Sequence, residues 1–333
     1  MAALVQKHQH RFAPGYNVQL RSIRLNLDPV KAVHRPCFFY AALFAMDCLG
    51  KILLHLSMSD RTAAYRSKVR RHRVRSNPKV TYWYRPGRTS SDSSDQAPLP
   101  VVFVHGLGAG ITPYLKFVWK VARATSQTAP LYLIELPHVS MRFHEHAPTI
   151  PETTRELDAA LREHGHRRAV FVGHSLGSAV VAGMCRWSRK RVAAVVLIDP
   201  ICFLLHLPAV AYQFVHRPPT RANERFVSFF ASRELFISRF ISRSFHWYHS
   251  CMWADDLPAG DMSTVYLSQN DLLVPSKQVD RYLERQGVQR QMMPLDHAQF
   301  LFAHQWETTV AKDVAERALY HGNRRSVAHA VVY

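Results

Sequence analysis

The chain has 333 residues, 47% of them hydrophobic and 11% aromatic, which is enough to bury one large core and argues against disorder as its main state. Its 43 basic and 24 acidic residues give a formal net charge of +19, which favours contact with anionic surfaces without choosing among them. The five cysteines are far apart and form no C-x-x-C pair, so they predict neither a disulfide framework nor a zinc site.

The N-terminal part contains one long apolar segment, residues 36–58. Within it Asp47, Lys51 and His55 recur every four residues and would form one polar stripe on a helix. Apolar side chains lie on another face: Phe39, Leu43, Met46, Leu53 and Leu56. The pattern predicts an amphipathic helix rather than a membrane span, which needs roughly 20 apolar residues with few charges. Three interpretations stay open: a helix packed on the protein's own surface, peripheral attachment to a membrane, and a true span.

A basic run from Arg66 to Arg75 follows this segment. Beside an amphipathic helix it could contact anionic lipid head groups, each basic side chain contributing about 1 kcal/mol, or it could be a solvated basic loop. No nucleic-acid partner is expected, because no recognition motif accompanies the charge. The first 27 residues show no export signal, so an intracellular location is predicted, with peripheral membrane association left open.

Strand-like segments begin at residues 79–84, which are β-branched and aromatic and are followed by Pro86, Gly87 and a polar loop over 89–96. Four Val, Leu and Ile-rich runs follow, ending at Gly106, Pro137, Ser175 and Pro200. Such runs are typical of strands covered on both faces, and the stretch 151–165 between two of them predicts a crossover helix. Repeated units of this kind predict a mostly parallel sheet flanked by helices.

The third run ends in Gly173-His174-Ser175-Leu176-Gly177, a G-x-S-x-G pattern between a strand and a helix. In this context the pattern predicts a nucleophile elbow, where flanking side chains at the glycines would collide with neighbouring backbone. Ser175 is therefore the predicted nucleophile, and the N–H of Leu176 is predicted to face the oxyanion. A second donor, the N–H of Leu107, is expected from the glycine-rich loop 105–110. His105 is interpreted as a residue that shapes this loop.

A serine nucleophile needs a general base and a carboxylate that orients it. With the chain order serine, acid, histidine, the acid should follow a late strand and the histidine the last one. Asp271, in the turn after 264–267, and His297, in the loop after the last apolar run, occupy these positions. Asp199 also ends a strand and is the alternative acid. Asp296 is excluded by adjacency, since neighbouring side chains in an extended loop point apart.

These motifs resemble the α/β-hydrolase superfamily over roughly residues 79–320. The resemblance implies a serine hydrolase on an α/β fold: a mostly parallel eight-stranded sheet flanked by helices. We expect an N-terminal extension over 1–75 with the amphipathic helix and the basic run, a core over 76–200 and 263–320, a helical cap over 201–262, and a tail over 321–333. No cofactor and no metal site is predicted.

The cap sequence is rich in aromatic residues, which either bind a hydrophobic acyl chain or pack the cap onto the core. Its arginines either meet an anionic group on the substrate or lie on a solvated face. The leading prediction is hydrolysis of a carboxylic ester, small or lipid, through an acyl-enzyme. Acyl transfer is the alternative, for which His55 and Asp60 form a weak H-x-x-x-x-D pattern, and a non-catalytic binding protein is the third possibility.

Overall fold

The computed structural model describes residues 15–19, 22–58, 68–74, 80–88, 97–144 and 146–328, with side chains up to Leu319. Several predicted features lie outside these residues: the ends of the basic run at 66, 67 and 75, Asp60, the loop 89–96, and residues 329–333 of the predicted tail.

An eight-stranded sheet forms the centre of the fold, with strand order β1-β2-β4-β3-β5-β6-β7-β8. The strands are β1 Arg70–Arg73, β2 Thr81–Arg85, β3 Val101–Val104, β4 Leu131–Glu135, β5 Ala169–His174, β6 Val192–Ile198, β7 Ser263–Ser268 and β8 Gln289–Met293. The β1/β2 and β2/β4 pairs are antiparallel and the other pairs are parallel. The predicted α/β-hydrolase fold class is thereby confirmed.

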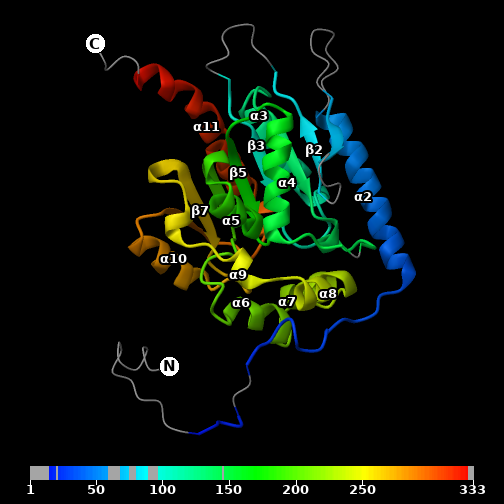
Figure 1. The fold of residues 1–333 in the computed structure, drawn as a ribbon. Helices are drawn as coiled ribbons and strands as arrows, with labels where there is room; N and C mark the ends of the chain where they lie inside the picture. Colours follow the sequence, from blue (N-terminus) through cyan, green and yellow to red (C-terminus); the bar gives the residue numbers. More distant parts are fainter. Residues whose placement is uncertain are drawn as a thin grey trace.

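Helices cover both faces of this sheet (Figure 1). They are α2 Cys37–Met58, α3 Leu115–Ala124, α4 Ile150–Glu163, α5 Gly177–Trp187, α6 Ala209–Ala211, α7 Ala222–Val227, α8 Leu235–Arg243, α9 Trp247–Ser250, α10 Ser276–Arg285 and α11 His304–Ala328. Side chains of α4, α5 and α10 belong to the core on one face, and those of α2, α3 and α11 to the core on the other. β3 to β6 are buried on both sides because their Val, Leu and Ile side chains meet both cores.

Four residues of the basic run form strand β1 at the edge of the sheet, so this part of the run is not the loop that was one of its two interpretations. Arg71 pairs with Trp83 in the register and its Nε lies 3.0 Å from Glu135 Oε2. Burial would raise the pKa of Glu135, but Arg71 and Trp83 donate hydrogen bonds to it and lower the pKa to about 2. An edge strand pairs with its neighbour through backbone hydrogen bonds. Its side chains are not needed for this pairing, so they can all be basic.

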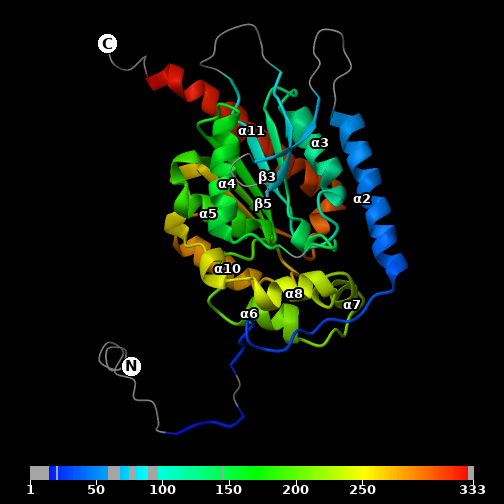
Figure 2. The ribbon, with the colours of Figure 1, turned by 45° about the vertical axis from the view of Figure 1, so that its right-hand side comes forward.

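Helix α2 runs along one side of the molecule (Figure 2). It is long and apolar enough to cross a membrane, judged by length and composition within the described residues. Of the predicted polar stripe, Asp47 faces the protein, where it is buried and pairs with Lys51 at 2.8 Å and with Arg142, whereas His55 is exposed. Most of the apolar side chains face outward instead.

Short helices between β6 and β7 form a layer at the carboxyl ends of the parallel strands, and the segment 22–36 passes along the outside of this layer (Figures 1 and 2). Hydrogen bonds join this layer, which is the expected cap, to the segment. Arg243 donates to the Asp28 carbonyl at 3.0 Å, and the Arg233 carbonyl accepts from the Val33 N–H at 2.9 Å. Arg217 pairs with Glu224 inside the cap, so these arginines have structural partners.

Candidate active site

Ser175 stands at the turn between β5 and α5, the position predicted for a nucleophile. Its backbone has φ +50°, a left-handed conformation that a non-glycine residue rarely adopts, and the side chain is 5% exposed. A Cβ on Gly177 would lie 2.2 Å from the Val104 carbonyl oxygen, and one on Gly173 would lie 3.0 Å from the Ser178 nitrogen. The turn therefore needs glycine at both positions so that α5 can lie against the sheet.

Ser175, His297 and Asp271 meet in one hydrogen-bonded line. His297 Nε2 lies 2.9 Å from Ser175 Oγ, and His297 Nδ1 lies 2.6 Å from Asp271 Oδ2. The other carboxylate oxygen of Asp271 accepts the N–H groups of Leu273 and Val274 at 2.7 and 2.9 Å, which fixes the carboxylate in its turn. The structure thus brings together the three side chains selected from the sequence, in the arrangement of a Ser-His-Asp triad.

The charge around His297 favours its protonated form. Burial by itself lowers the pKa of the imidazole, but the negative charge and hydrogen bond of Asp271, with a further contribution from Asp199, raise it to about 9. An imidazolium between these carboxylates is therefore stabilised, which is the form that a general base reaches after taking a proton.

Asp199, the alternative acid, lies beside the triad but does not contact His297 through a hydrogen bond. It is fully buried, and its two oxygens accept the N–H groups of Ser268 at 2.8 Å and Ala298 at 2.9 Å. Burial raises the pKa of its carboxyl group. These bonds tie the strand before Asp271 to the loop that carries His297.

Asp296 points elsewhere, because its Oδ2 accepts from Asn223 Nδ2 in the cap at 3.2 Å.

The predicted oxyanion donors, the N–H groups of Leu107 and Leu176, belong to residues that line one cavity together with Ser175. In the described part of the chain neither N–H donates to another group. His105 holds the loop in place: its Nε2 accepts the Leu136 N–H at 3.1 Å, so its Nδ1 carries the proton and donates to the Gly106 carbonyl at 2.7 Å. Burial lowers the pKa of His105 to about 4, which keeps it neutral and suits a structural role.

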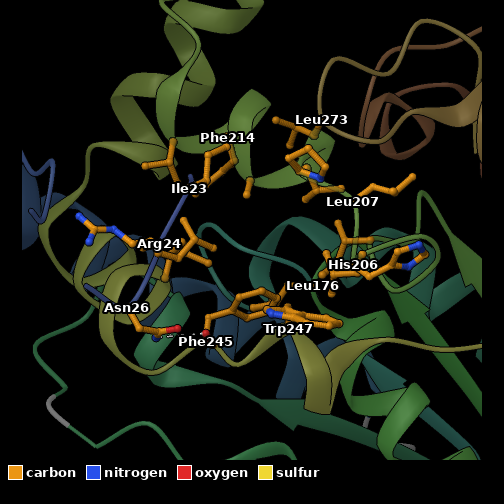
Figure 3. Close-up of a pocket in the computed structure, with 18 of the residues that line it drawn as sticks. Ile23, Arg24, Asn26, Leu176, His206, Leu207, Phe214, Phe245, Trp247 and Leu273 are labelled. Atoms are coloured by element: carbon orange, nitrogen blue, oxygen red, sulfur yellow. Dashed lines mark hydrogen bonds between the residues drawn. The ribbon is translucent and has the colours of Figure 1, made fainter. Parts of the chain in front are cut away.

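The cavity above Ser175 has a volume of about 400 Å³. Phe214 and Leu273 lie on one side of it, Phe245 and Trp247 on the opposite side, and the N-terminal segment closes one end through Ile23 (Figure 3). Asn26 Nδ2 donates to the Phe245 carbonyl at 3.3 Å and so attaches this segment to the cap. Nearly all other lining side chains are leucine, isoleucine, valine, alanine or proline, so the cavity suits a hydrophobic group.

A family model described as "Alpha/beta hydrolase family" matches residues 101–314. The chain belongs to the alpha/beta hydrolase family. A protein assigned as a lipase from Acinetobacter baumannii AYE superposes with a TM-score of 0.52 at 12% identity, over 80% of this chain and 93% of that one. A membrane phospholipase A, described as a bacterial virulence factor, superposes with a TM-score of 0.50 at 13% identity, over 82% and 94% of the two chains. Both similarities concern the fold. A search of curated proteins gives no match.

Two aspartates and one histidine at this site are residue types that commonly bind metal ions. Ligand atoms of Asp199, Asp271 and His297 lie within 4.8 Å of one another. Most of their lone pairs are already engaged, however: both oxygens of Asp199 and one of Asp271 accept backbone N–H groups, and His297 Nδ1 faces Asp271. The donor set therefore fits a hydrogen-bonded triad better than a cation.

A second group of residues, next to the turn that carries Ser175, was not predicted from the sequence. The Tyr114 hydroxyl accepts the Gly106 N–H at 3.3 Å and is hydrogen-bonded to His174 Nδ1 at 2.7 Å. Tyr114 and His174 are buried, and burial lowers the pKa of His174 well below its usual value. The pair connects the glycine-rich loop to the residue before the nucleophile, and no motif in the sequence links residues 60 positions apart.

Proposed function

We propose that the chain is a serine hydrolase that cleaves carboxylic esters with a hydrophobic acyl group through an acyl-enzyme. The observation that carries this proposal is the 2.9 Å contact between Ser175 Oγ and His297 Nε2 at the wall of an apolar cavity of about 400 Å³. A serine becomes nucleophilic when a base can take its proton as it attacks, and this geometry supplies such a base.

In the acylation step, Ser175 Oγ forms a bond to the ester carbonyl carbon while its proton passes to His297 Nε2. The carbonyl oxygen becomes negative and binds the N–H groups of Leu107 and Leu176, a role supported by the position of both residues at the cavity beside Ser175. Each donor of this kind contributes about 3–4 kcal/mol to the transition state. When the intermediate collapses, the ester C–O bond breaks and His297 gives the proton to the leaving alcohol.

In the deacylation step, a water molecule attacks the acyl-enzyme while His297 Nε2 takes one of its protons. The second tetrahedral intermediate breaks the bond between Ser175 Oγ and the acyl carbon, and the proton returns to Oγ. Asp271 keeps the Nδ1–H of His297 directed at its carboxylate in both steps, so Nε2 stays free to exchange protons.

The lining of the cavity supports an acyl chain or another apolar group as the part of the substrate that is recognised. Its volume lies at the lower end of the range for pockets that enclose small organic ligands, about 300–1,000 Å³. Charged side chains contribute little to it: the Arg24 side chain is 60% exposed and pairs with Asp28 at 3.3 Å. A bound ester would therefore be held mainly by burial of its apolar part.

Acyl transfer would require an alcohol or thiol to replace water in the second step. The pattern that suggested it does not involve the cavity, because His55 Nδ1 lies 3.3 Å from the Val69 carbonyl at the far end of α2. No contact of the described residues favours transfer over hydrolysis.

A fluorophosphonate probe tests the proposal, since it reacts with activated serines. The unaltered protein should be labelled and should hydrolyse p-nitrophenyl esters of medium chain length, and Ser175→Ala should lose both. Ser188→Ala, at the end of the same helix α5, is the matched control and should retain them. Labelling that persists in Ser175→Ala, with circular dichroism showing both variants folded, would reject Ser175 as the nucleophile.

A further inference from the structure

Helix α2 leaves an apolar face uncovered along its whole length. Large side chains on this face are exposed: Phe38 75%, Met46 38%, Leu49 56%, Ile52 56%, Leu53 47% and Leu56 51%. A helix on the surface of a protein in water usually shows the reverse, with apolar side chains turned inward. An apolar surface of this extent marks a site of interaction.

The polar side of α2 is anchored to the protein by specific contacts. Asp47 is buried between Lys51 and Arg142. Gly50 lies so close to Thr112 that a Cβ there would be 2.2 Å from its Oγ1. Leu54 and Met58 are buried in the core on this side of the sheet. These contacts set the rotation of the helix, so the outward direction of the apolar face is built into the fold.

We propose that α2 docks the protein on an anionic lipid bilayer, with the helix lying flat in the interface. A 22-residue helix is about 33 Å long, enough to present several turns of apolar side chains to the acyl boundary. Because the opposite side of α2 is packed on α3 and on residues 112–114, a transmembrane orientation would draw the catalytic domain into the hydrocarbon. The flat orientation avoids this.

The charges around α2 match an anionic surface. Residues 29–58 contain a single acidic residue, Asp47, and it is buried and paired. At the C-terminal end of the helix, where His55 contacts the Val69 carbonyl, Lys68, Arg70 and Arg73 are exposed. Basic side chains at the edge of an apolar face are typical of interfacial helices. The net charge of +19 also opposes the pairing of two copies through this face.

The apolar surface continues from α2 onto the cap. The Phe39 ring lies 5.7 Å from that of Phe229, and Phe226 and Phe229 are 62% and 43% exposed. On the other side of the helix, the Tyr40 ring lies 5.1 Å from that of Phe143, which is 76% exposed. Docking through α2 would therefore place the cap, which covers Ser175, against the same bilayer.

Co-sedimentation of the full chain with vesicles tests this proposal without using its activity. Vesicles of phosphatidylcholine alone are compared with vesicles that also contain phosphatidylserine. The double variant Leu49→Glu/Ile52→Glu places carboxylates on the apolar face, and Leu319→Glu, 42% exposed on α11, is the matched control. The double variant should lose about 100-fold in partition coefficient, roughly tenfold for each apolar side chain replaced, and the control should bind like the unaltered protein.

Anionic vesicles should bind the unaltered protein more strongly than neutral ones, and added salt should weaken this binding. Thermal unfolding followed by circular dichroism shows whether the variants are folded. The proposal is overturned if the folded double variant binds as tightly as the control, or if binding does not depend on phosphatidylserine. It is also overturned if the unaltered protein ignores vesicles but forms a dimer in analytical ultracentrifugation that the double variant does not form.

Discussion

Replacing Asp271 with asparagine keeps the shape of the side chain and removes the charge that faces His297 Nδ1 at 2.6 Å. The amide no longer stabilises the imidazolium, and it can hold the imidazole in the wrong tautomer. In triads of this geometry such a change lowers kcat by about 10⁴, which corresponds to about 5.5 kcal/mol in the activation free energy. Folding should be little affected, because an amide oxygen can still accept the N–H groups of Leu273 and Val274.

Asp199→Asn provides the comparison, because Asp199 has the same chemistry in the same cluster but different partners. Its two oxygens accept the N–H groups of Ser268 and Ala298, and an asparagine can accept only one of them through oxygen. One buried N–H would then face an amide NH₂, which costs about 1–3 kcal/mol of folding free energy. We expect a lower unfolding midpoint and a loss in kcat far smaller than that of Asp271→Asn.

Both variants are assayed with the same activated ester at saturating concentration, and urea unfolding is measured in parallel. The structure predicts opposite profiles: Asp271→Asn loses turnover and keeps its stability, whereas Asp199→Asn loses stability and keeps most of its turnover. If the 10⁴-fold loss follows Asp199→Asn instead, the assignment of the acid is wrong, and the catalytic role passes to the residue at the end of β6.

Three further predictions follow from the site. His297 must be neutral to accept a proton, and its pKa is raised to about 9. We therefore expect kcat/KM to rise about tenfold for each pH unit until the pH reaches this pKa. A kcat/KM that is already constant above pH 6.5 would contradict this expectation. Gly177→Ala places a Cβ 2.2 Å from the Val104 carbonyl oxygen and should therefore lower the free energy of unfolding, measured in urea, by about 1–3 kcal/mol or more. An unchanged unfolding midpoint would show that α5 is free to move away from the sheet. Val210→Trp fills part of the cavity and should lower kcat/KM at least about tenfold for a decanoyl ester while leaving an acetyl ester unaffected. Equal losses for both esters would show that the cavity does not bind the acyl chain.

The parallel strands and the elbow could be predicted because their signals are local. Val, Leu and Ile runs identify strands buried on two faces, and the glycines around Ser175 are required by close backbone contacts within a few residues of it. His297 and Asp271 could be selected because the order of catalytic residues along the chain follows the order of strands in such a sheet. Their 2.6 Å contact is a consequence of that topology.

Other features depend on pairs of residues far apart in the chain, which composition and periodicity do not record. Strand β1 has basic side chains because only its backbone is needed for pairing, so its residues look like a solvated loop. The polar stripe of α2 was predicted, but the burial of Asp47 depends on Arg142, which lies 95 residues further along the chain. Likewise, Tyr114 reaches His174 across 60 residues.

The wall that residues 23–27 contribute to the cavity lies outside the stretch 101–314 that the family model matches. The proposed reacting groups and one wall of the cavity are therefore encoded in separate parts of the gene. Relatives aligned over 101–314 can share the chemistry and still differ in what they accept, because the segment that closes the cavity can change by replacement, lengthening or loss without touching the triad. A chain that began at residue 97 would contain Ser175, Asp271 and His297 but would lack the side chains of residues 23–27 that line the cavity.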